Sequence, residues 1–159
     1  MMGIKQHIID EAFGELEYED DYDRYLRKYE ISIFSRSYNI VLIVEGNGDK
    51  NLIYPEQRSA FEQLERNKES IVADLEKSLF AYYKSEALDM PEFFEDLQVA
   101  QKPEEMTQLL RLRWLRFPRV LDKGQILYGF LFECSWDPEH GLAARYDNEN
   151  LSIGQQDIL

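Results

Sequence analysis

Residues 38–45, with the sequence YNIVLIVE, and residues 126–134, with the sequence ILYGFLFEC, are two continuous, mostly apolar stretches of this 159-residue chain. Each is short and is rich in β-branched or aromatic side chains. Each is also bounded by residues that favour turns, which is typical of strands inside a sheet. We therefore expect both segments near the centre of a β-sheet, with residues 38–45 buried on both faces.

The residues before the first apolar stretch predict two further strands. Residues 25–34 alternate between apolar and polar side chains, so we expect an antiparallel hairpin with 38–45 and a turn at 36–38. Residues 13–18 also alternate, with acidic side chains pointing outward, and an acidic turn follows at 19–23.

The middle of the chain has a helical pattern over residues 55–84. Pro55 suits the first position of a helix, where its missing N–H costs nothing. Apolar side chains then recur at every fourth position, at Ile71, Leu75 and Leu79. Asn67 is a candidate cap for a second helix, so the pattern allows either one kinked helix or two.

The remaining segments complete the predicted fold. Residues 86–102 read as a loop with a short turn at 91–97, and residues 104–110 read as a brief helix after Pro103. Further strands are expected at 111–119, 126–134, 141–146 and 151–153. This order predicts an α+β fold: one domain over residues 1–159, with a mostly antiparallel sheet of about six strands and a long central helical segment packed on one face.

Most of the negative charge lies at the two ends of the chain. The net charge is −13, and residues 1–23 hold eight acids and one base, while residues 124–159 hold six acids and one base. If the fold brought these ends together, one face would be strongly anionic. Such a face repels nucleic acid and anionic lipid and favours a cationic protein partner. We therefore expect neither nucleic acid nor membrane as a partner.

The cysteine content and the start of the chain indicate a cellular compartment. Cys134 has no second cysteine to pair with, which fits a reducing environment. The first residues turn acidic at once and contain no apolar core of a secretory signal. The longest apolar run, residues 40–44, is far too short to span a bilayer. We expect a cytoplasmic protein.

One cluster contains the residue types of an active site. Cys134, Asp137, Glu139 and His140 lie within seven residues. A structural zinc site needs about four ligands, usually in two separated pairs, and this chain has no second cysteine. We interpret the cluster as a turn and expect no catalytic residue, metal or cofactor. The alternative is a small-ligand or metal-binding enzyme that uses Asp137, Glu139 and His140.

Two charged segments resemble ligand-binding sites, one for calcium and one for nucleic acid. The acidic residues 15–23 lack the glycine that an EF-hand calcium loop needs, so a solvated acidic edge is favoured. A basic stripe interleaved with Trp114 and Phe117 is formed by Arg111, Arg113, Arg116 and Arg119. Because the net charge of −13 opposes nucleic-acid binding, we interpret this stripe as an internal counter-charge to the acidic ends.

The C-terminal third contains a pattern that resembles a family. It reads Trp-Asp-x-Glu-His-Gly, then Ile-Gly-x-x-Asp, and is formed by Trp136, Asp137, Glu139, His140, Gly141, Ile153, Gly154 and Asp157. A tyrosine-rich helix end, with Phe80, Tyr82 and Tyr83, accompanies it. The chain thus resembles an uncharacterised family of small acidic bacterial cytoplasmic proteins. The resemblance implies that some members are encoded beside contact-dependent or polymorphic toxins and act as immunity proteins, and it supplies no catalytic residues.

These observations favour a non-enzymatic binding protein. The expected function is that of an immunity protein, which binds a cationic toxin domain and covers its active site through an acidic surface. We expect the toxin domain to be a nuclease. Tyrosine is enriched at protein interfaces, and complementary charge speeds association. The candidate contact residues are Glu15, Glu17, Glu19, Asp20, Asp21 and Tyr22, followed by Asp147 and Glu149.

Overall fold

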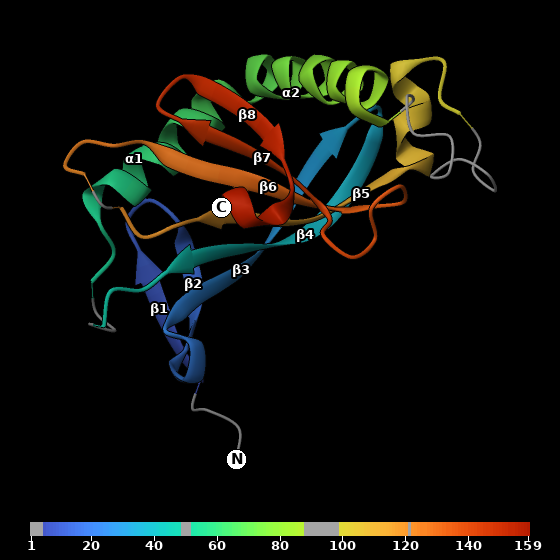
Figure 1. The fold of residues 1–159 in the computed structure, drawn as a ribbon. Helices are drawn as coiled ribbons and strands as arrows, with labels where there is room; N and C mark the ends of the chain where they lie inside the picture. The colour runs from blue at the N-terminus through green and yellow to red at the C-terminus, as the bar shows by residue number, and fades with distance from the viewer. Residues whose placement is uncertain (1–4, 49–51, 88–98, 121) are drawn as a thin grey trace.

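The computed structural model describes residues 5–48, 52–87, 99–120 and 122–159. In these residues one eight-stranded sheet carries the α-helices on one face (Figure 1). The order of the strands in the sheet follows their order in the chain. The strands are β1 (Lys5–Asp10), β2 (Gly14–Glu19), β3 (Arg24–Ile33), β4 (Arg36–Glu45), β5 (Leu110–Phe117), β6 (Leu127–Cys134), β7 (Leu142–Asp147) and β8 (Asn150–Gly154).

The sheet consists of two antiparallel groups, β1–β4 and β5–β8, which meet in a parallel pair. β4 and β5 run in the same direction because a helical crossover joins them. The crossover begins with α1 (Pro55–Arg66) and α2 (Lys68–Tyr82) and continues into the π-helical turn η2 (Tyr83–Ala87). A 3₁₀ helix, η4 (Pro103–Gln108), directly precedes β5.

The predicted fold class was wrong. The described sheet has eight strands, not about six, and it is mixed, since β4 and β5 are parallel. Of the two alternatives for residues 55–84, the structure has two helices, since α1 ends at Arg66 and α2 begins at Lys68, on either side of Asn67. Most of the loop predicted over 86–102, including its turn at 91–97, lies outside the described residues.

The β3–β4 turn is displaced from its predicted position at 36–38. The connecting residues are Phe34 and Ser35, with φ angles of 52° and 62°. Two positive φ angles suit a tight hairpin turn, which usually contains Asn or Gly. The Phe34 side chain is buried, and its amide donates to the Glu76 carboxylate of α2 over 3.1 Å. Tertiary packing therefore holds a turn that the local sequence does not favour.

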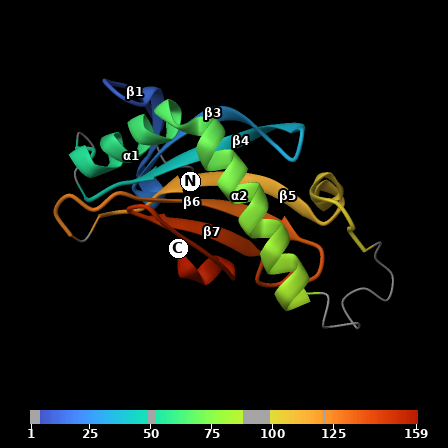
Figure 2. The same cartoon turned by 90° about the horizontal axis from the view of Figure 1, so that it is seen from above.

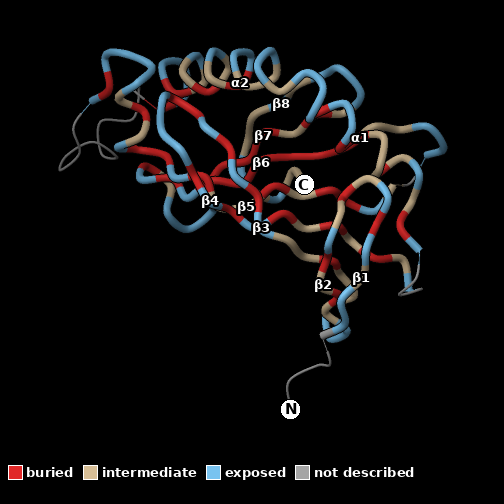
Figure 3. The backbone as a smooth tube through the Cα atoms, turned by 180° about the vertical axis from the view of Figure 1, so that it is seen from behind, coloured by how far each residue is buried: buried red, intermediate tan, exposed pale blue. Residues whose placement is uncertain are grey.

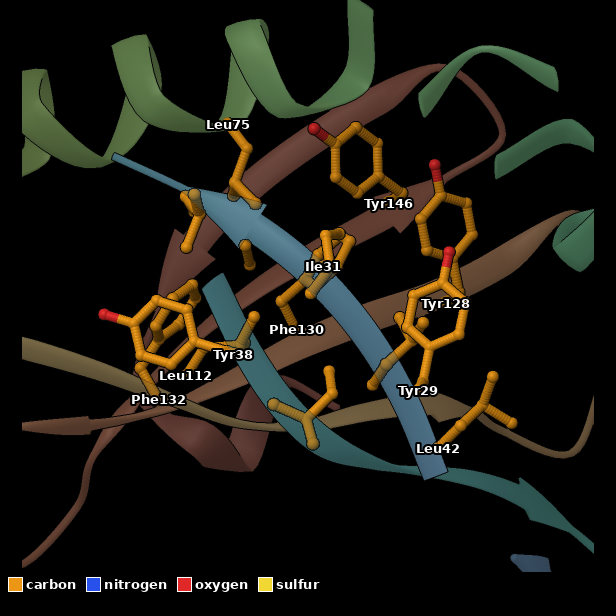
Figure 4. Packing of buried hydrophobic residues seen from close by; sticks show 14 of the residues in the cluster. Tyr29, Ile31, Tyr38, Leu42, Leu75, Leu112, Tyr128, Phe130, Phe132 and Tyr146 are labelled. Carbon is orange, nitrogen blue, oxygen red and sulfur yellow. The ribbon is translucent and has the colours of Figure 1, made fainter. Parts of the chain in front are cut away.

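The core lies between the sheet and the two helices, on what we call the covered face. Figure 2 shows α2 lying across the middle of the sheet, and α1 contacts β5 and β6. Stacked rings continue along this face: the Phe13 and Phe61 centroids are 4.7 Å apart, and those of Tyr128 and Tyr146 are 4.9 Å apart. Figure 4 shows Tyr128, Phe130 and Tyr146 among these packed side chains.

The opposite face, which we call the open face, is covered only in part. The C-terminal 3₁₀ helix η5 (Gln156–Ile158) and Leu159 lie against β6 there, where a side chain at Gly129 would collide with Leu159. This cover explains why β6 is buried almost throughout (Figure 3). β4 has no such cover along its length: Val41 is 38% exposed, so the expectation that residues 38–45 are buried on both faces was wrong.

Candidate partner-binding surface

Three of the predicted contact residues lie on one strand and on one face. Leu16 and Tyr18 of β2 are buried on the covered face, so the alternating Glu15, Glu17 and Glu19 point to the open face. The chain then turns through η1 (Asp20–Tyr22), which places Asp20, Asp21 and Tyr22 at the end of the same strand. The structure therefore brings the first six predicted residues together at one end of the sheet.

The neighbouring edge strand β1, which the sequence analysis did not predict, adds an apolar side chain to this group. Ile9 pairs with Glu15 across the strands and is 85% exposed. Tyr22 is 69% exposed, and the Arg24 guanidinium lies 4.5 Å from the centre of its ring. Two exposed apolar side chains thus stand among these acids. We call Ile9, Glu15, Glu17, Glu19, Asp20, Asp21 and Tyr22 the acidic edge.

Some acids of the N-terminal segment are engaged within the fold. Glu19 accepts from Arg24 at 2.7 Å, and the buried Asp10 pairs with Arg58 of α1 at 2.8 Å. Glu15 lies 3.8 Å from the ring nitrogen of His7, and both side chains are largely exposed. The exposed acids of this segment are Glu11, Glu15, Asp20 and Asp21.

The last two predicted contact residues lie elsewhere. Asp147 ends β7 and Glu149 stands in the turn before β8, at the other edge of the sheet from β1 and β2. Asp147 is held by Arg145 at 3.3 Å and by the side-chain amide of Gln125 at 3.2 Å. The fold therefore places the two acidic ends of the chain at opposite edges of the sheet. They do not form the single anionic face that would arise if the ends lay together.

Three of the four arginines of the predicted basic stripe contact acids, and two of these acids, Glu133 and Asp23, belong to the acidic ends of the chain. Arg116 pairs with Glu45 of β4, and Arg113 lies 3.4 Å from Glu133 of β6. Arg119 lies 3.7 Å from Asp23 and also donates to the carbonyl of Gly46 over 2.8 Å. These pairs connect the centre of the sheet to acids on both sides of it.

The Trp136–Gly141 turn is held by structural contacts. One oxygen of Asp137 lies 3.0 Å from His140 Nδ1, and the other accepts from Gln155 over 3.2 Å. Burial raises the pKa of Asp137, but hydrogen bonds from His140 and Gln155 outweigh it and lower the pKa overall. The same hydrogen bond, which the Asp137 carboxylate accepts, raises the pKa of His140. Asp137 thus fastens the turn to the C-terminal segment.

The other members of that cluster are placed unfavourably for joint chemistry. Glu139 is exposed on the turn, and Cys134 is buried. Burial raises the pKa of the Cys134 thiol to about 12, so it is protonated and poorly nucleophilic at neutral pH. Within the residues that the structure describes, no group of three or more His, Cys, Asp or Glu side chains is arranged to hold a metal ion.

The fold is a single-sheet domain in which the acidic edge lies beside the edge strand β1. The chain belongs to the family of domains of unknown function DUF6985, whose model matches residues 12–159. No curated protein and no solved structure matched the chain. Among the helices in the described part of the chain, none has the length and apolar character needed to cross a membrane.

Proposed function

We propose that this domain is a non-catalytic binding protein that neutralises a cationic protein toxin. In this proposal it acts in the bacterial cytoplasm as an immunity protein and covers the active site of a toxin domain. The toxin domain that we propose is a nuclease. Support comes from its resemblance to small acidic proteins of which some are encoded beside toxins, and from the composition of the acidic edge.

The observation that carries the proposal is the placement of Ile9 and Tyr22. They are 85% and 69% exposed and flank the acids of β2 and η1 at one end of the sheet. Ile9 lies opposite Glu15 at the start of β2, and Tyr22 follows the end of β2, so one exposed apolar side chain stands at each end of the row of acids. The two side chains supply anchors, and the surrounding carboxylates supply charge.

The proposed mechanism is electrostatic capture followed by apolar contact. A nuclease gathers Lys and Arg around its substrate phosphates, so an acidic surface meets complementary charge there. Complementary charge raises the association rate to about 10⁸–10⁹ M⁻¹s⁻¹ at low salt. Buried aromatic and aliphatic anchors then slow dissociation, because a few such residues carry most of the binding energy of an interface.

Co-expression tests the proposal. The domain is expressed with the toxin domain encoded immediately upstream of its gene, and growth of the host is the readout. We expect the wild-type domain to restore growth and a variant with Glu15, Glu17, Asp20 and Asp21 each changed to Lys to fail. The absence of a toxin domain upstream, or equal protection by both proteins, would contradict it.

A further inference from the structure

The parallel pair at the centre of the sheet is open at one end. β4 and β5 are paired from Val41 and Trp114 to Val44 and Phe117. The residues before them, 36–40 of β4 and 110–112 of β5, pair with β3 and β6 on their outer sides and not with one another. Two strands that separate in this way leave backbone donors and acceptors along both inner edges of the gap.

Two adjoining cavities occupy this gap. One has a volume of about 530 Å³ and reaches Gln108 and Ser135, and the other has a volume of about 410 Å³ and reaches Tyr38 and Trp114. Arg36 and Arg111 line both cavities. The two arginines therefore stand where the cavities meet, at the amino ends of the parallel strands.

The charge in this cleft is opposite to that of the molecule. Glu133, the acid that lines the first cavity, pairs with Arg113 at 3.4 Å. Among the described residues, neither Arg36 nor Arg111 has a carboxylate within 4.0 Å, although the chain carries 31 acids and 18 bases. Two guanidinium groups without carboxylate partners in a cavity retain their capacity for an external anion.

Tyr38 adds a hydroxyl donor to the two arginines. The Arg36 guanidinium lies 5.4 Å from the centre of the Tyr38 ring. Burial raises the pKa of Tyr38, while Arg36 and Arg111, both near the phenol, act in the opposite direction without reversing the shift. The phenol thus keeps its proton at neutral pH and is able to donate a hydrogen bond.

We propose that the cleft between the separated amino ends of β4 and β5 binds a small anionic ligand through a phosphate or carboxylate group held by Arg36 and Arg111. Guanidinium groups bind both oxyanions through short, charge-assisted hydrogen bonds. The Tyr38 hydroxyl completes the set of donors, and the second cavity accommodates the rest of the ligand beside Trp114. This site lies in the middle of the sheet and is independent of the acidic edge.

Calorimetric titration of the whole chain with inorganic phosphate, and separately with succinate, tests the proposal, with sodium chloride at matched ionic strength as the reference. Saturation by phosphate alone assigns a phosphate ligand, and saturation by succinate alone assigns a carboxylate; either result supports the site. We expect R36Q and R111Q each to weaken binding about tenfold or more. The matched control is R66Q, which removes an equal charge from the exposed end of α1.

Two further measurements show whether a loss of binding comes from the cleft itself or from unfolding of the variant. Thermal unfolding of each variant shows whether it is folded, and the shift of the Trp114 side-chain N–H resonance reports occupancy of the second cavity. The fourfold Lys variant of the acidic edge is expected to bind the probe at least as well as the wild type. Binding no stronger than that of chloride, or equal binding by folded wild type and R36Q/R111Q, would overturn the proposal.

Discussion

The phenol of Tyr18 donates a 2.7 Å hydrogen bond to the carboxylate of Asp23. The second carboxylate oxygen of Asp23 accepts from the amide of Gly48 over 2.7 Å, and the Asp23 carbonyl accepts from Gly46 over 2.8 Å. Asp23 therefore joins the β2–β3 connection to the segment that follows β4. Each acid of the N-terminal segment contributes one negative charge, but the acids differ in role: some hold the fold together and others face solvent.

Replacement of Asp23 separates these roles. We expect Asp23→Ala to lower the free energy of unfolding by about 2–3 kcal/mol, because two hydrogen bonds to a charged acceptor are lost. Asp23 also has a φ angle of 48°, which Asn tolerates better than Ala. Asp23→Asn is therefore the matched control and is expected to retain most of the stability. Urea unfolding measures both; equal loss in the two variants would contradict the hydrogen-bond account.

Gln57 closes the carboxyl ends of the parallel strands. Its fully buried amide nitrogen donates to the carbonyls of Glu45 and Phe117 over 2.9 Å and 3.1 Å. We expect Gln57→Leu to destabilise the fold by about 2–4 kcal/mol, because buried carbonyl oxygens lose their donors. Gln63→Leu, at an exposed position of the same helix, is the control and should change stability little. A Gln57→Leu midpoint in urea equal to that of the wild type would refute this role.

Asp10 should make part of the stability depend on pH. Burial would raise its pKa, but the hydrogen bonds from Arg58 and from the amides of Phe13 and Ala12 together lower it below the ordinary value of 3.8. A lowered folded-state pKa stabilises the fold above 3.8, and this stabilisation is lost as the pH falls through the folded-state value. The stability difference between the wild type and Asp10→Asn should therefore shrink below that pH in urea unfolding. A difference that stays constant down to acid unfolding would exclude the linkage.

The packing of Leu159 on β6 is tested by a double-mutant cycle. A methyl group at Gly129 would collide with the end of the flexible Leu159 side chain, which must move, so we expect Gly129→Ala to cost about 1 kcal/mol. Leu159→Ala removes the colliding atoms, and its presence should reduce the cost of Gly129→Ala. Additive effects of the two substitutions would show that the C-terminal residue does not cover β6 in solution.

Strand positions could be predicted where the pattern is local. The apolar runs at 38–45 and 126–134 correspond closely to β4 and β6, and Pro55 begins α1 as expected. The number of strands could not be predicted, because β1 has only a weak alternating pattern in which an exposed Ile9 faces solvent. Nor could the parallel pairing of β4 and β5, which depends on where the helical crossover returns the chain to the sheet.

The residues of the candidate site could be predicted from the sequence, but their positions relative to one another could be predicted only in part. Acidic alternation along residues 13–18 placed Glu15 and Glu17 on one face, and the structure has them there. The separation of Asp147 from these residues depends on the order of strands across the sheet, which charge and periodicity do not contain. The cleft around Arg36 and Arg111 is likewise a property of incomplete strand pairing, for which the sequence has no local signal.

The most direct test of the central claim is the affinity for the upstream-encoded toxin domain, measured by calorimetry at two salt concentrations. For the variant with Glu15, Glu17, Asp20 and Asp21 changed to Lys, the account predicts a loss of about a hundredfold or more, together with a weaker salt dependence. Asp147→Lys/Glu149→Lys, on the opposite edge of the sheet, should bind within about threefold of the wild type, a difference below 1 kcal/mol. Undiminished binding by the acidic-edge variant, or equal losses in both variants, would contradict the account.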